Sequence, residues 1–345
     1  MQMAHPYPVR EIARQSGLSE ATVDRVLNNR PGVRASTAAT VTRAITDLDR
    51  QRSQLRLNGR TFLIDIVMQT PARFSAAVKS ALELELPTLR PALIRSRFDF
   101  RETARPAELV KSLDAIRHRG SMGVILKAPD VPEIGEAVAR VRDAGIPVVT
   151  LVTDLPLSKR VAYVGIDNRA AGATAAFLID QLLAGRPGSI LLALSRSAFR
   201  GEEEREVGFR ATIRQLAPER ELVEATDTDG IDVFVRDKTV DILRSRPDIT
   251  AVYSMGGGNS AILEAFASVG RTCRVFIAHD LDRDNLALIQ NRQITAVLHH
   301  DLRLDMRRAC QIIMQASGGI EGQIESDPSQ INVVTPYNIP NQRIL

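Results

Sequence analysis

Several polar residues lie directly after apolar segments, at positions where their side chains can contact a small molecule. Arg205 and Asp280 are a donor and an acceptor that together can bind hydroxyl groups in pairs, as recognition of a polyol requires. Lys127 follows the segment MGVIL, Asp154 follows IPVVTLV and Asp167 follows AYVGI. We predict that these residues help to bind a ligand, although each can instead cap a helix or form a surface ion pair.

Two further segments have the composition of binding loops. Phe74 comes soon after the first apolar segment, FLIDIVM, and can either stack on a ligand ring or pack in the core. The segment SMGGGNSA, residues 254–261, places Gly257 close to Asn259 at the start of a helical stretch. Glycine lets the backbone approach a ligand with its N–H donors exposed. This loop therefore either binds a carboxylate or phosphate group or forms a tight turn without a ligand.

Motifs for catalysis and for metal binding are missing from the sequence. It contains no G-x-S-x-G and no H-E-x-x-H motif, and its aspartates are scattered along the chain. The pairs His279-Asp280 and His299-His300 contain metal-binding residue types, but adjacent side chains at the end of a strand point to opposite faces. We therefore predict that the protein is not an enzyme and holds neither a cofactor nor a metal ion.

Composition and charge indicate a globular protein with a polyanion-binding N-terminal part. Hydrophobic residues make up 44% and charged residues 25% of the chain, as in an ordinary globular protein. Residues 1–60 contain ten arginines, no lysine and five acidic residues, so the basic excess lies there. The chain has two cysteines, no apolar run of about 18 residues and no apolar signal segment near its N-terminus. These features predict a cytoplasmic protein that does not contact a membrane.

The basic part begins with the pattern of two short helices joined by a glycine turn. Residues 9–15 are amphipathic, and Gly17 is expected to end this helix because glycine adopts a positive φ at little cost. Ser19 is placed to cap a second helix over residues 20–27. Two helices in this arrangement predict the helix-turn-helix of DNA-binding proteins.

A third helix and a polar segment follow. A loop over residues 28–34 precedes the third predicted helix, which Ser36 is expected to cap and which ends near Leu48. Residues 49–60, DRQRSQLRLNGR, are polar, arginine-rich and end in Asn-Gly, a composition that is typical of a linker. We expect this linker to be helical only when another part of the protein covers its leucines.

From Phe62 onward, apolar runs alternate with helical stretches of ten to sixteen residues. Alternation at this spacing predicts parallel strands with helices on both faces of the sheet. Because about ten or eleven strands are expected, we predict an α/β fold with two doubly wound parallel sheets rather than one. Such sheets bind ligands at the carboxyl ends of their strands, where the polar residues described above lie.

Three segments together resemble one protein family. VREIARQSGLSEATVDRVLN is similar to the pattern V-x-x-V-A-x-x-A-G-V-S-x-x-T-V-S-R-V-L-N, and residues 165–172 and 204–210 are similar to the patterns D-N-x-x-x-G and R-x-x-G-F. Asp280, in FIAHDLD, matches an aspartate at the end of a strand. These patterns are those of the lactose/galactose repressor (LacI/GalR) family of bacterial transcription regulators, which the chain resembles over essentially its whole length.

The resemblance implies three parts. They are a helix-turn-helix domain over residues 1–50, a hinge over residues 51–60, and a two-lobed sugar-binding domain over residues 61–345, similar to periplasmic binding proteins. We expect the lobes to divide as follows: lobe 1 at about 61–165 and 292–320, and lobe 2 at about 166–291 and 321–345.

The second helix is then the expected recognition helix. Because such a helix enters the major groove with its N-terminus first, Glu20, Ala21 and Arg25 are predicted to face base edges. Ser19 and Thr22 offer hydroxyls to phosphates. The full predicted DNA-binding set is Ser19, Glu20, Ala21, Thr22, Asp24, Arg25, Asn28, Arg34 and Leu57.

Three positions depart from the family pattern. Asp24 replaces a serine that contacts phosphate, so its carboxylate either accepts a hydrogen bond from a cytosine amine or pairs with a neighbouring arginine. The hinge is about two residues shorter and lacks proline, and Leu57 best matches the leucine that family members insert into the minor groove. Leu55 is the rival candidate, and a flexible tether is the alternative to both. Gly257-Gly258 replaces the family's Asn-Asp pair.

These features predict a sequence-specific DNA-binding transcription regulator, a repressor, whose operator affinity is controlled by a small carbohydrate-like effector between the lobes. A homodimer that reads a pseudo-palindromic operator of double-stranded DNA is expected, because one recognition helix contacts only a few base pairs. The alternative is the solute-binding protein of a sugar transporter, which would need an export signal. The predicted ligand-binding set is Phe74, Lys127, Asp154, Asp167, Arg205, Gly257, Asn259 and Asp280.

Overall fold

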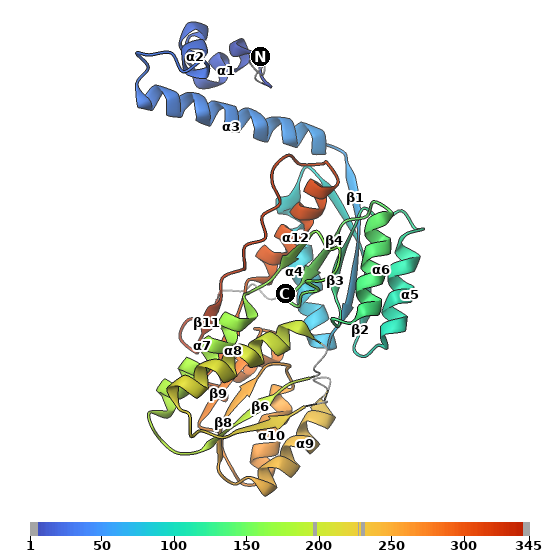
Figure 1. Cartoon of the computed structure of the whole chain (residues 1–345), viewed down its shortest axis with the longest axis vertical. Coiled ribbons are helices and arrows are strands. Elements are labelled where there is room, and N and C mark those ends of the chain that lie inside the picture. Colours follow the sequence, from blue (N-terminus) through green and yellow to red (C-terminus); the bar gives the residue numbers. More distant parts are fainter. Residues whose placement is uncertain (1–5, 196–198, 227, 229–231, 341–345) are drawn as a thin grey trace.

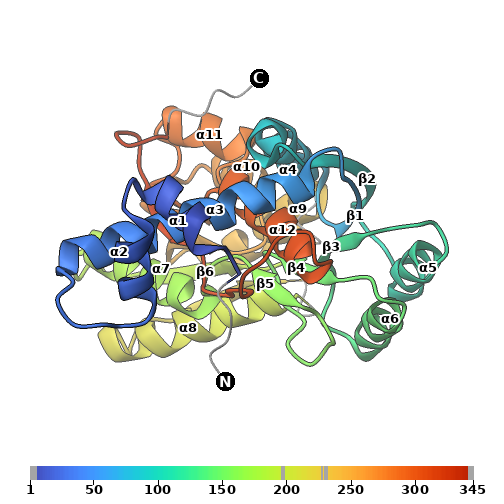
Figure 2. The same ribbon diagram turned by 90° about the horizontal axis from the view of Figure 1, so that it is seen from above.

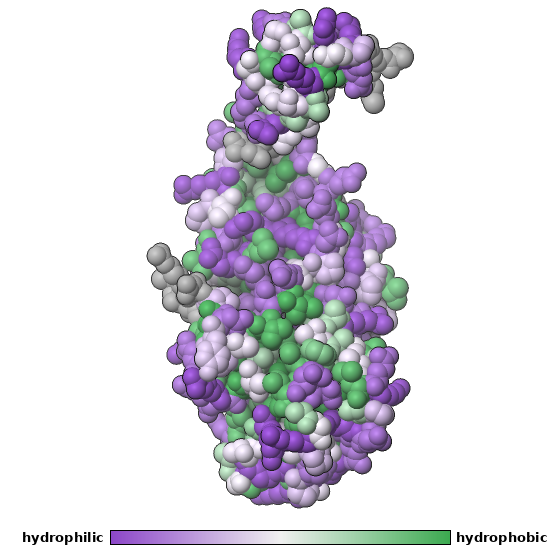
Figure 3. Space-filling model, turned by 90° about the vertical axis from the view of Figure 1, so that its left-hand side faces the viewer, coloured by the Kyte–Doolittle hydropathy of each residue, from purple (hydrophilic) through white to green (hydrophobic). Residues whose placement is uncertain are grey.

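The computed structural model describes residues 6–195, 199–226, 228 and 232–340. A small helical head is joined by one long helix to two α/β lobes that lie one beyond the other (Figure 1). Figure 3 shows that the head stands clear of the lobes on a narrower neck. Within the described residues, no helix has the length and apolar character needed to cross a membrane.

The head consists of α1 (Val9–Ser16), α2 (Glu20–Leu27) and the first part of α3 (Ala35–Leu57). Gly17 ends α1 with a left-handed φ of 70°, and Ser19 caps α2 by accepting a hydrogen bond from the backbone N–H of Thr22. Both predicted caps are therefore confirmed. The core of the head is small and apolar, and its buried members are Tyr7, Ile12, Ala13, Val23, Val41, Ala44 and Leu48.

The third helix is longer than predicted and begins differently. Arg34 precedes its first turn without a side-chain cap, so Ser36 lies inside the helix and is not its cap. The helix continues to Leu57, so residues 49–57 are helical in this structure, the case expected when another part of the protein covers the leucines of this segment. The reason is that this range contains neither glycine nor proline, and lobe 1 covers Leu57, which is 6% exposed.

Lobe 1 contains a five-stranded, wholly parallel sheet in the order β2-β1-β3-β4-β5. Helices α5 and α6 cover one face and α4 and α12 the other, as Figures 1 and 2 both show. Its elements are β1 (Thr61–Gln69), α4 (Ala72–Glu85), the 3₁₀ helix η1 (Leu86–Leu89), β2 (Leu93–Arg101), α5 (Pro106–Ile116), β3 (Gly123–Lys127), α6 (Pro132–Asp143), β4 (Val148–Leu151), β5 (Ala162–Val164) and α12 (Leu302–Ala316).

Lobe 2 contains a six-stranded sheet in the order β11-β10-β9-β8-β6-β7, in which β11 alone runs antiparallel to its neighbour. Helices α7 and α8 pack on one face, and α9, α10 and α11 on the other. Its elements are α7 (Asn168–Leu183), β6 (Ser189–Ala193), α8 (Arg200–Leu216), β7 (Leu222–Ala225), α9 (Asp232–Ser245), β8 (Ile249–Ser254), α10 (Asn259–Ser268), β9 (Val275–His279), α11 (Arg283–Gln290), β10 (Ala296–His299) and β11 (Asn332–Val334).

The two predicted parallel sheets are thus present, but one strand belongs to the other lobe. We expected residues 292–320 in lobe 1, whereas β10 pairs with β9 and is part of the second sheet. Within the described residues the chain crosses between the lobes after β5, after β10 and after α12. The first and third crossovers contact each other, because the backbone N–H of Ser329 donates to the carbonyl of Gly165 at 2.7 Å.

Two glycines allow α7 and α8 to cross closely. A Cβ on Gly172 would lie 1.9 Å from the carbonyl oxygen of Arg205, and a Cβ on Gly208 would lie 2.1 Å from that of Arg169. Both distances are below any real contact, so no larger residue fits while the helices keep this separation. The glycines of the two family-like segments, 165–172 and 204–210, therefore set the position of α8, which carries Arg205.

We expect Gly172→Ala and Gly208→Ala each to lower the free energy of unfolding by about 1–3 kcal/mol, because the added methyl group overpacks the crossing. Thermal unfolding followed by circular dichroism measures this effect. The matched control is Gly135→Ala in α6, where a Cβ meets nothing within 4 Å. The free energy of unfolding of this control variant should be unchanged or increase by up to about 1 kcal/mol, because alanine has a higher helix propensity than glycine. Equal melting temperatures for all three variants would contradict the packing argument.

Candidate functional sites: a DNA-binding head and a pocket between the lobes

The first turn of α2 faces solvent. Ser19, Glu20, Ala21 and Arg25 are exposed, and Arg34 is exposed just before α3. Buried Val23 fixes the opposite side of the helix to the head, so the N-terminal end of α2 is free to enter a groove. The exposed arginines supply guanidinium groups that can bind either guanine or phosphate.

The carboxylate of Asp24 has partners within the head. The Asn28 side chain donates to Asp24 Oδ1 at 2.8 Å, and Nη1 of Arg30 lies 3.3 Å from Asp24 Oδ2. Of the two alternatives for Asp24, the structure thus contains the pairing with a neighbouring arginine. Thr22 is held in the same turn, because its hydroxyl is 2.8 Å from that of Ser19.

Leu57 lies in the apolar core of lobe 1 and not on the DNA-binding side of the head. The prediction that it inserts into the minor groove is therefore wrong for this arrangement of the chain. The cause is the continuous α3, which carries Leu57 into the lobe before the chain turns at Gly59, with a φ of 74°, into β1. The rival, Leu55, is 75% exposed.

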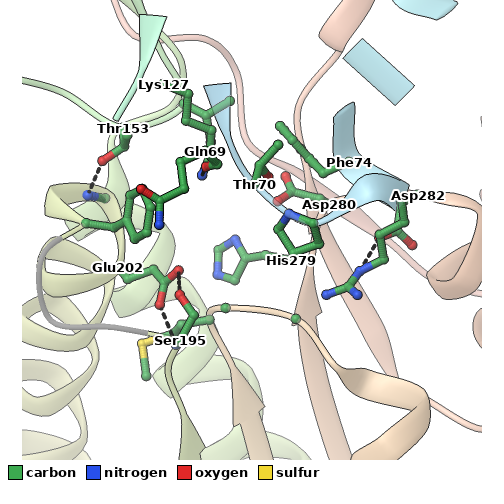
Figure 4. A pocket seen from close by; sticks show the side chains of 18 of the residues that line it. Gln69, Thr70, Phe74, Lys127, Thr153, Ser195, Glu202, His279, Asp280 and Asp282 are labelled. Carbon is green, nitrogen blue, oxygen red and sulfur yellow. Dashed lines mark hydrogen bonds and ion pairs between the residues drawn. The ribbon is translucent and has the colours of Figure 1, made fainter. Parts of the chain in front are cut away.

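The carboxyl ends of both sheets enclose a pocket of about 70 Å³ between the lobes. Figure 4 shows Gln69, Thr70 and Lys127 on the side of lobe 1, and Ser195, Glu202 and His279 on the side of lobe 2. This is the position that parallel sheets predict for a ligand. Of the predicted ligand-binding residues, the pocket is lined by Phe74, Lys127, Arg205, Gly257 and Asp280.

Arg205 is the most buried cation of the pocket, at 3% exposed. Its Nε donates to Oδ1 of Asn168 at 2.8 Å, and its Nη1 donates to the carbonyl of Met255 at 3.0 Å. Both acceptors are uncharged, so the guanidinium keeps its full charge beside the pocket. Asn168 is thus the residue that orients Arg205. It follows AYVGI directly after Asp167, and the predicted ligand-binding set contained Asp167 and not Asn168.

Asp167 does not reach the pocket. It is exposed and caps α7 by accepting a hydrogen bond from the backbone N–H of Ala170 at 3.0 Å, so the alternative of a helix cap is the correct one. Asp154 also lies outside the pocket lining. It accepts from the Thr150 hydroxyl at 2.8 Å and pairs with Arg160, as an aspartate with a structural role does.

Asn259 is buried at the start of α10, where its side chain donates to Oδ1 of Asn285 at 2.6 Å. It is not among the residues that line the pocket, because the helical first turn directs its side chain toward α11, and its role as a ligand contact stays a prediction. Asn285 does line the pocket. Its side-chain amide donates to the backbone carbonyl of His279 at 2.8 Å and to that of Asp280 at 2.7 Å.

Asp280 adopts a left-handed φ of 64° directly after β9, and this turns its carboxylate toward the pocket. Its Oδ1 lies 3.4 Å from Nε2 of His300. Burial alone would raise the pKa of Asp280, but the contact with His300 and the charge of Arg205 lower it well below its ordinary value. The pocket therefore presents a carboxylate that stays ionised, an acceptor for ligand hydroxyls.

Lys127 is held between the two lobes. Its Nζ donates to the carbonyl of Gln69 at 3.2 Å and lies 4.3 Å from the centre of the Phe199 ring of lobe 2. Removal of the ammonium from water lowers its pKa to about 8, although the carboxylates of Glu202 and Asp280 oppose this shift. Lys127 has no ion-pair partner among the described residues, so its charge is available to a ligand.

Three buried polar atoms of the pocket lack a hydrogen-bond partner among the described residues: Oε1 of Gln69, Nδ1 of His279 and Oδ1 of Asp280. Gln69 is 2% and His279 5% exposed, and the other ring nitrogen of His279 bonds the Tyr253 hydroxyl at 2.8 Å. Buried polar groups are normally paired, so these atoms mark places where a ligand can bind. Glu202 is partnered instead, since the hydroxyl of Ser195 donates to it at 2.5 Å.

The glycine loop faces a side chain of the other lobe. A Cβ on Gly257 would lie 2.2 Å from Nη2 of Arg73, which belongs to α4 of lobe 1. Nε of Arg73 also lies 3.3 Å from Oδ2 of Asp282, and Nη1 lies 3.7 Å from Asp232. Gly257 thus lines the pocket and also accommodates a bridge between the lobes. Burial raises the pKa of Asp282 to about 6.

Phe74 fits both of its proposed roles. It is 7% exposed, packs in the apolar core of lobe 1 from α4, and also lines the pocket.

No group of three or more His, Cys, Asp or Glu side chains suited to a metal ion occurs in the described part of the chain. His299 and His300 bond different groups, since Nδ1 of His299 accepts from the backbone N–H of Leu281 at 3.2 Å.

A helix-turn-helix head followed by two lobes that enclose a polar pocket is the architecture of DNA-binding transcription regulators with a periplasmic-binding-protein-like domain. Sequence comparison supports both parts. Residues 9–52 match the model for bacterial regulatory proteins of the lacI family, and residues 74–321 match that for a periplasmic binding protein domain. The chain thus has a helix-turn-helix domain of the lacI family of bacterial regulatory proteins, and its larger part belongs to the periplasmic binding protein domain family.

Two curated regulators are similar to the chain. The HTH-type transcriptional regulator MalR of Streptomyces coelicolor is 27% identical over 274 residues, which span 77% of this chain and 70% of that protein. The HTH-type transcriptional regulator reg1 of Streptomyces lividans is 26% identical over 282 residues, which again span 77% of this chain and 70% of that protein.

Solved structures share the two-lobed fold. The glucose-galactose binding protein GanP from Geobacillus stearothermophilus superposes with a TM-score of 0.72 at 19% identity, covering 81% of this chain and 99% of its own. A protein of Bacteroides fragilis described as a LacI transcriptional regulator superposes with a TM-score of 0.69 at 17% identity, covering 81% of this chain and 98% of its own. At these identities the likeness establishes the fold alone.

We expect Lys127→Met to stabilise the protein by about 1–3 kcal/mol at pH 7, because it removes a desolvated ammonium and keeps the apolar stem. A lysine with a folded pKa near 8, against its ordinary 10.5, costs stability below pH 8. This cost disappears as the pH rises toward 10.5, so the difference in melting temperature should shrink between pH 7 and pH 10. The control is Lys111→Met, because Lys111 is exposed. A similar gain in melting temperature for this variant would refute the argument that burial of the Lys127 ammonium costs stability.

Proposed function

We propose that this protein is a repressor whose affinity for its DNA operator is controlled by a small carbohydrate-like effector bound between the two lobes. One observation carries the proposal: a head with an exposed recognition helix is joined by α3 to lobe 1, which shares its polar pocket with lobe 2. The rival function, solute binding for a sugar transporter, leaves this basic head without a role.

In the proposed complex, the exposed side chains of Glu20, Ala21 and Arg25 face base edges in the major groove. Ser19 and Arg34 are exposed beside them and bind phosphates, and Thr22 and Asn28 support the same surface. A homodimer presents two such helices to a pseudo-palindromic operator, and its two-fold symmetry doubles both the base contacts and the phosphate contacts.

The effector is proposed to be a sugar or a sugar derivative. The ionised carboxylate of Asp280 and the guanidinium of Arg205 can bind neighbouring hydroxyls in pairs, and Phe74 offers an apolar surface to a ring. The structural neighbours include proteins described as binding glucose and galactose, and D-arabinose. A carboxylate on the sugar would meet the ammonium of Lys127.

The lobes are coupled to the head through the lower end of α3. Leu57 packs in lobe 1, and the next arginine, Arg60, lies over the Phe62 ring and donates to the carbonyl of Ser317 at the end of α12. Because α12 starts at a crossover between the lobes, a rotation of lobe 2 alters the support of α3. A coupling of about 1–3 kcal/mol would change operator affinity by about 5–150-fold.

DNA binding is tested by selecting bound sequences from a random double-stranded library and measuring affinity for the selected site. We expect an inverted repeat and a loss of about 1–3 kcal/mol for Arg25→Ala, because Arg25 faces base edges. Arg186→Ala, an exposed arginine of lobe 2, is the matched control and should bind as the unaltered protein does. A library without enrichment, or equal losses for both variants, would count against the proposal.

Effector binding is tested by thermal shift with glucose, galactose, arabinose, xylose, ribose, inositol and gluconate. We expect at least one of these to raise the melting temperature, and Arg205→Lys and Asn168→Ala to reduce that shift at least fivefold. Lysine keeps the charge of Arg205 but not its two fixed hydrogen bonds. Arg169→Lys is the control, since Arg169 is exposed at the neighbouring position. A full shift in Arg205→Lys would remove this residue from the site.

A further inference from the structure

The imidazole of His300 is buried between two carboxylates in the crossover from β10 to α12. Its Nε2 lies 3.4 Å from Oδ1 of Asp280 in the pocket, and its Nδ1 is hydrogen-bonded to Oδ2 of Asp305. The His300 and Asp305 side chains are each 1% exposed. A neutral imidazole has one N–H group, so only the protonated ring can donate toward both carboxylates.

This pair of contacts belongs to a longer polar chain. The hydroxyl of Ser329, in the crossover after α12, donates to Oδ1 of Asp305 at 2.5 Å. The backbone N–H of Ser329 donates to the carbonyl of Gly165, in the crossover after β5, at 2.7 Å. The chain Asp280–His300–Asp305–Ser329–Gly165 therefore begins in the pocket and includes a residue from each of the three crossovers.

We propose that protonated His300 is a positioning residue of the pocket, which holds the Asp280 carboxylate for the effector and ties it to all three crossovers. This inference rests on the proposed function, because there Asp280 is an effector contact. A change of lobe arrangement bends the crossovers, so it alters the distance from His300 to one of its two carboxylates. An effector that fixes Asp280 thereby favours the lobe arrangement in which both contacts are present.

The charge state of His300 agrees with this geometry. Burial alone would lower the pKa of His300, but the contact with Asp280 and the hydrogen bond to Asp305 raise it to about 9. The ring is therefore charged at neutral pH, and it neutralises part of the negative charge that the two carboxylates bring into the protein interior. This arrangement lowers the cost of burying the pocket carboxylate.

The other ionisable groups around this ring are accounted for. From β10, His299 has a pKa lowered to about 4 by burial, and from β9, His279 has a pKa well below its ordinary value for the same reason. Asp301 is bonded to the backbone N–H groups of the first turn of α12, and Arg205 acts through its charge across the pocket. Above pH 7, Lys127 is the pocket group that also titrates, near pH 8.

The first experiment follows the histidine ring signals of the full-length protein by NMR between pH 5 and pH 10.5. His300 is assigned with His300→Gln, and we expect it to titrate near pH 9, while exposed His118 serves as the internal reference. Asp280→Asn and Asp305→Asn should each lower the midpoint of His300 by about 1–3 pH units, because each removes one adjacent negative charge. A His300 midpoint near 6.5, or a midpoint that Asp280→Asn leaves unchanged, would overturn the proposal.

The second experiment measures the distance between the lobes. Spin labels at Lys111→Cys in lobe 1 and Lys238→Cys in lobe 2, with Cys273 and Cys310 replaced by serine and alanine, report the distance distribution by pulsed EPR. We expect His300→Gln and Asp305→Asn to broaden this distribution at pH 7.5, and the matched control His118→Gln to leave it unchanged. Equally narrow distributions in all variants would show that His300 does not tie the crossovers and would refute the proposal.

The outcomes separate this inference from the proposed function. If none of the tested sugars binds while His300 titrates near pH 9 and its variants broaden the lobe distances, the effector assignment fails and the role of His300 at the crossovers stands. If a sugar binds, and if its binding is weakened by substitution of Arg205 while His300 titrates near pH 6.5, the positioning role fails and the proposed function stands.

Discussion

Buried charge at the junction of the two lobes is the constraint on which the pocket depends. Arg205, which is 3% exposed, and the carboxylate of Asp280 lie where the carboxyl ends of the two sheets meet. A charge there is tolerated only if protein groups replace its hydration. Asn168 and the carbonyl of Met255 do this for Arg205 through hydrogen bonds, and the opposite charge of His300 at 3.4 Å stabilises the carboxylate of Asp280.

The same constraint explains why the charged groups of the pocket lower the stability of the folded protein. The lowered pKa of Lys127 and the raised pKa of Asp282 both record charged groups that the fold holds against the cost of desolvation. Arg73 offsets part of this cost by pairing with Asp282 across the lobes. A protein selected for stability alone would replace such groups with apolar residues, so their presence indicates a site kept for binding.

Much of the fold follows from local patterns. Gly17 and Ser19 specify the ends of α1 and α2 because capping depends on the few residues around a helix end. Strand and helix alternation predicted two parallel sheets, and these are present. The pocket is less predictable. Arg205 and Asp280 line it, but Asp167 caps a helix while its neighbour Asn168 supports Arg205, because strand-end position does not tell which of two adjacent side chains turns inward.

The sequence by itself determined the helix-turn-helix head, the two doubly wound sheets and the edge at which polar residues gather, since periodicity and caps are local properties. Only the tertiary structure decided the rest. It placed Leu57 in lobe 1, paired Gly257 with Arg73, moved β10 into the second sheet and brought His300 between Asp280 and Asp305. These are contacts between segments far apart in the chain, and their partners are set by how the lobes pack, which no local pattern encodes.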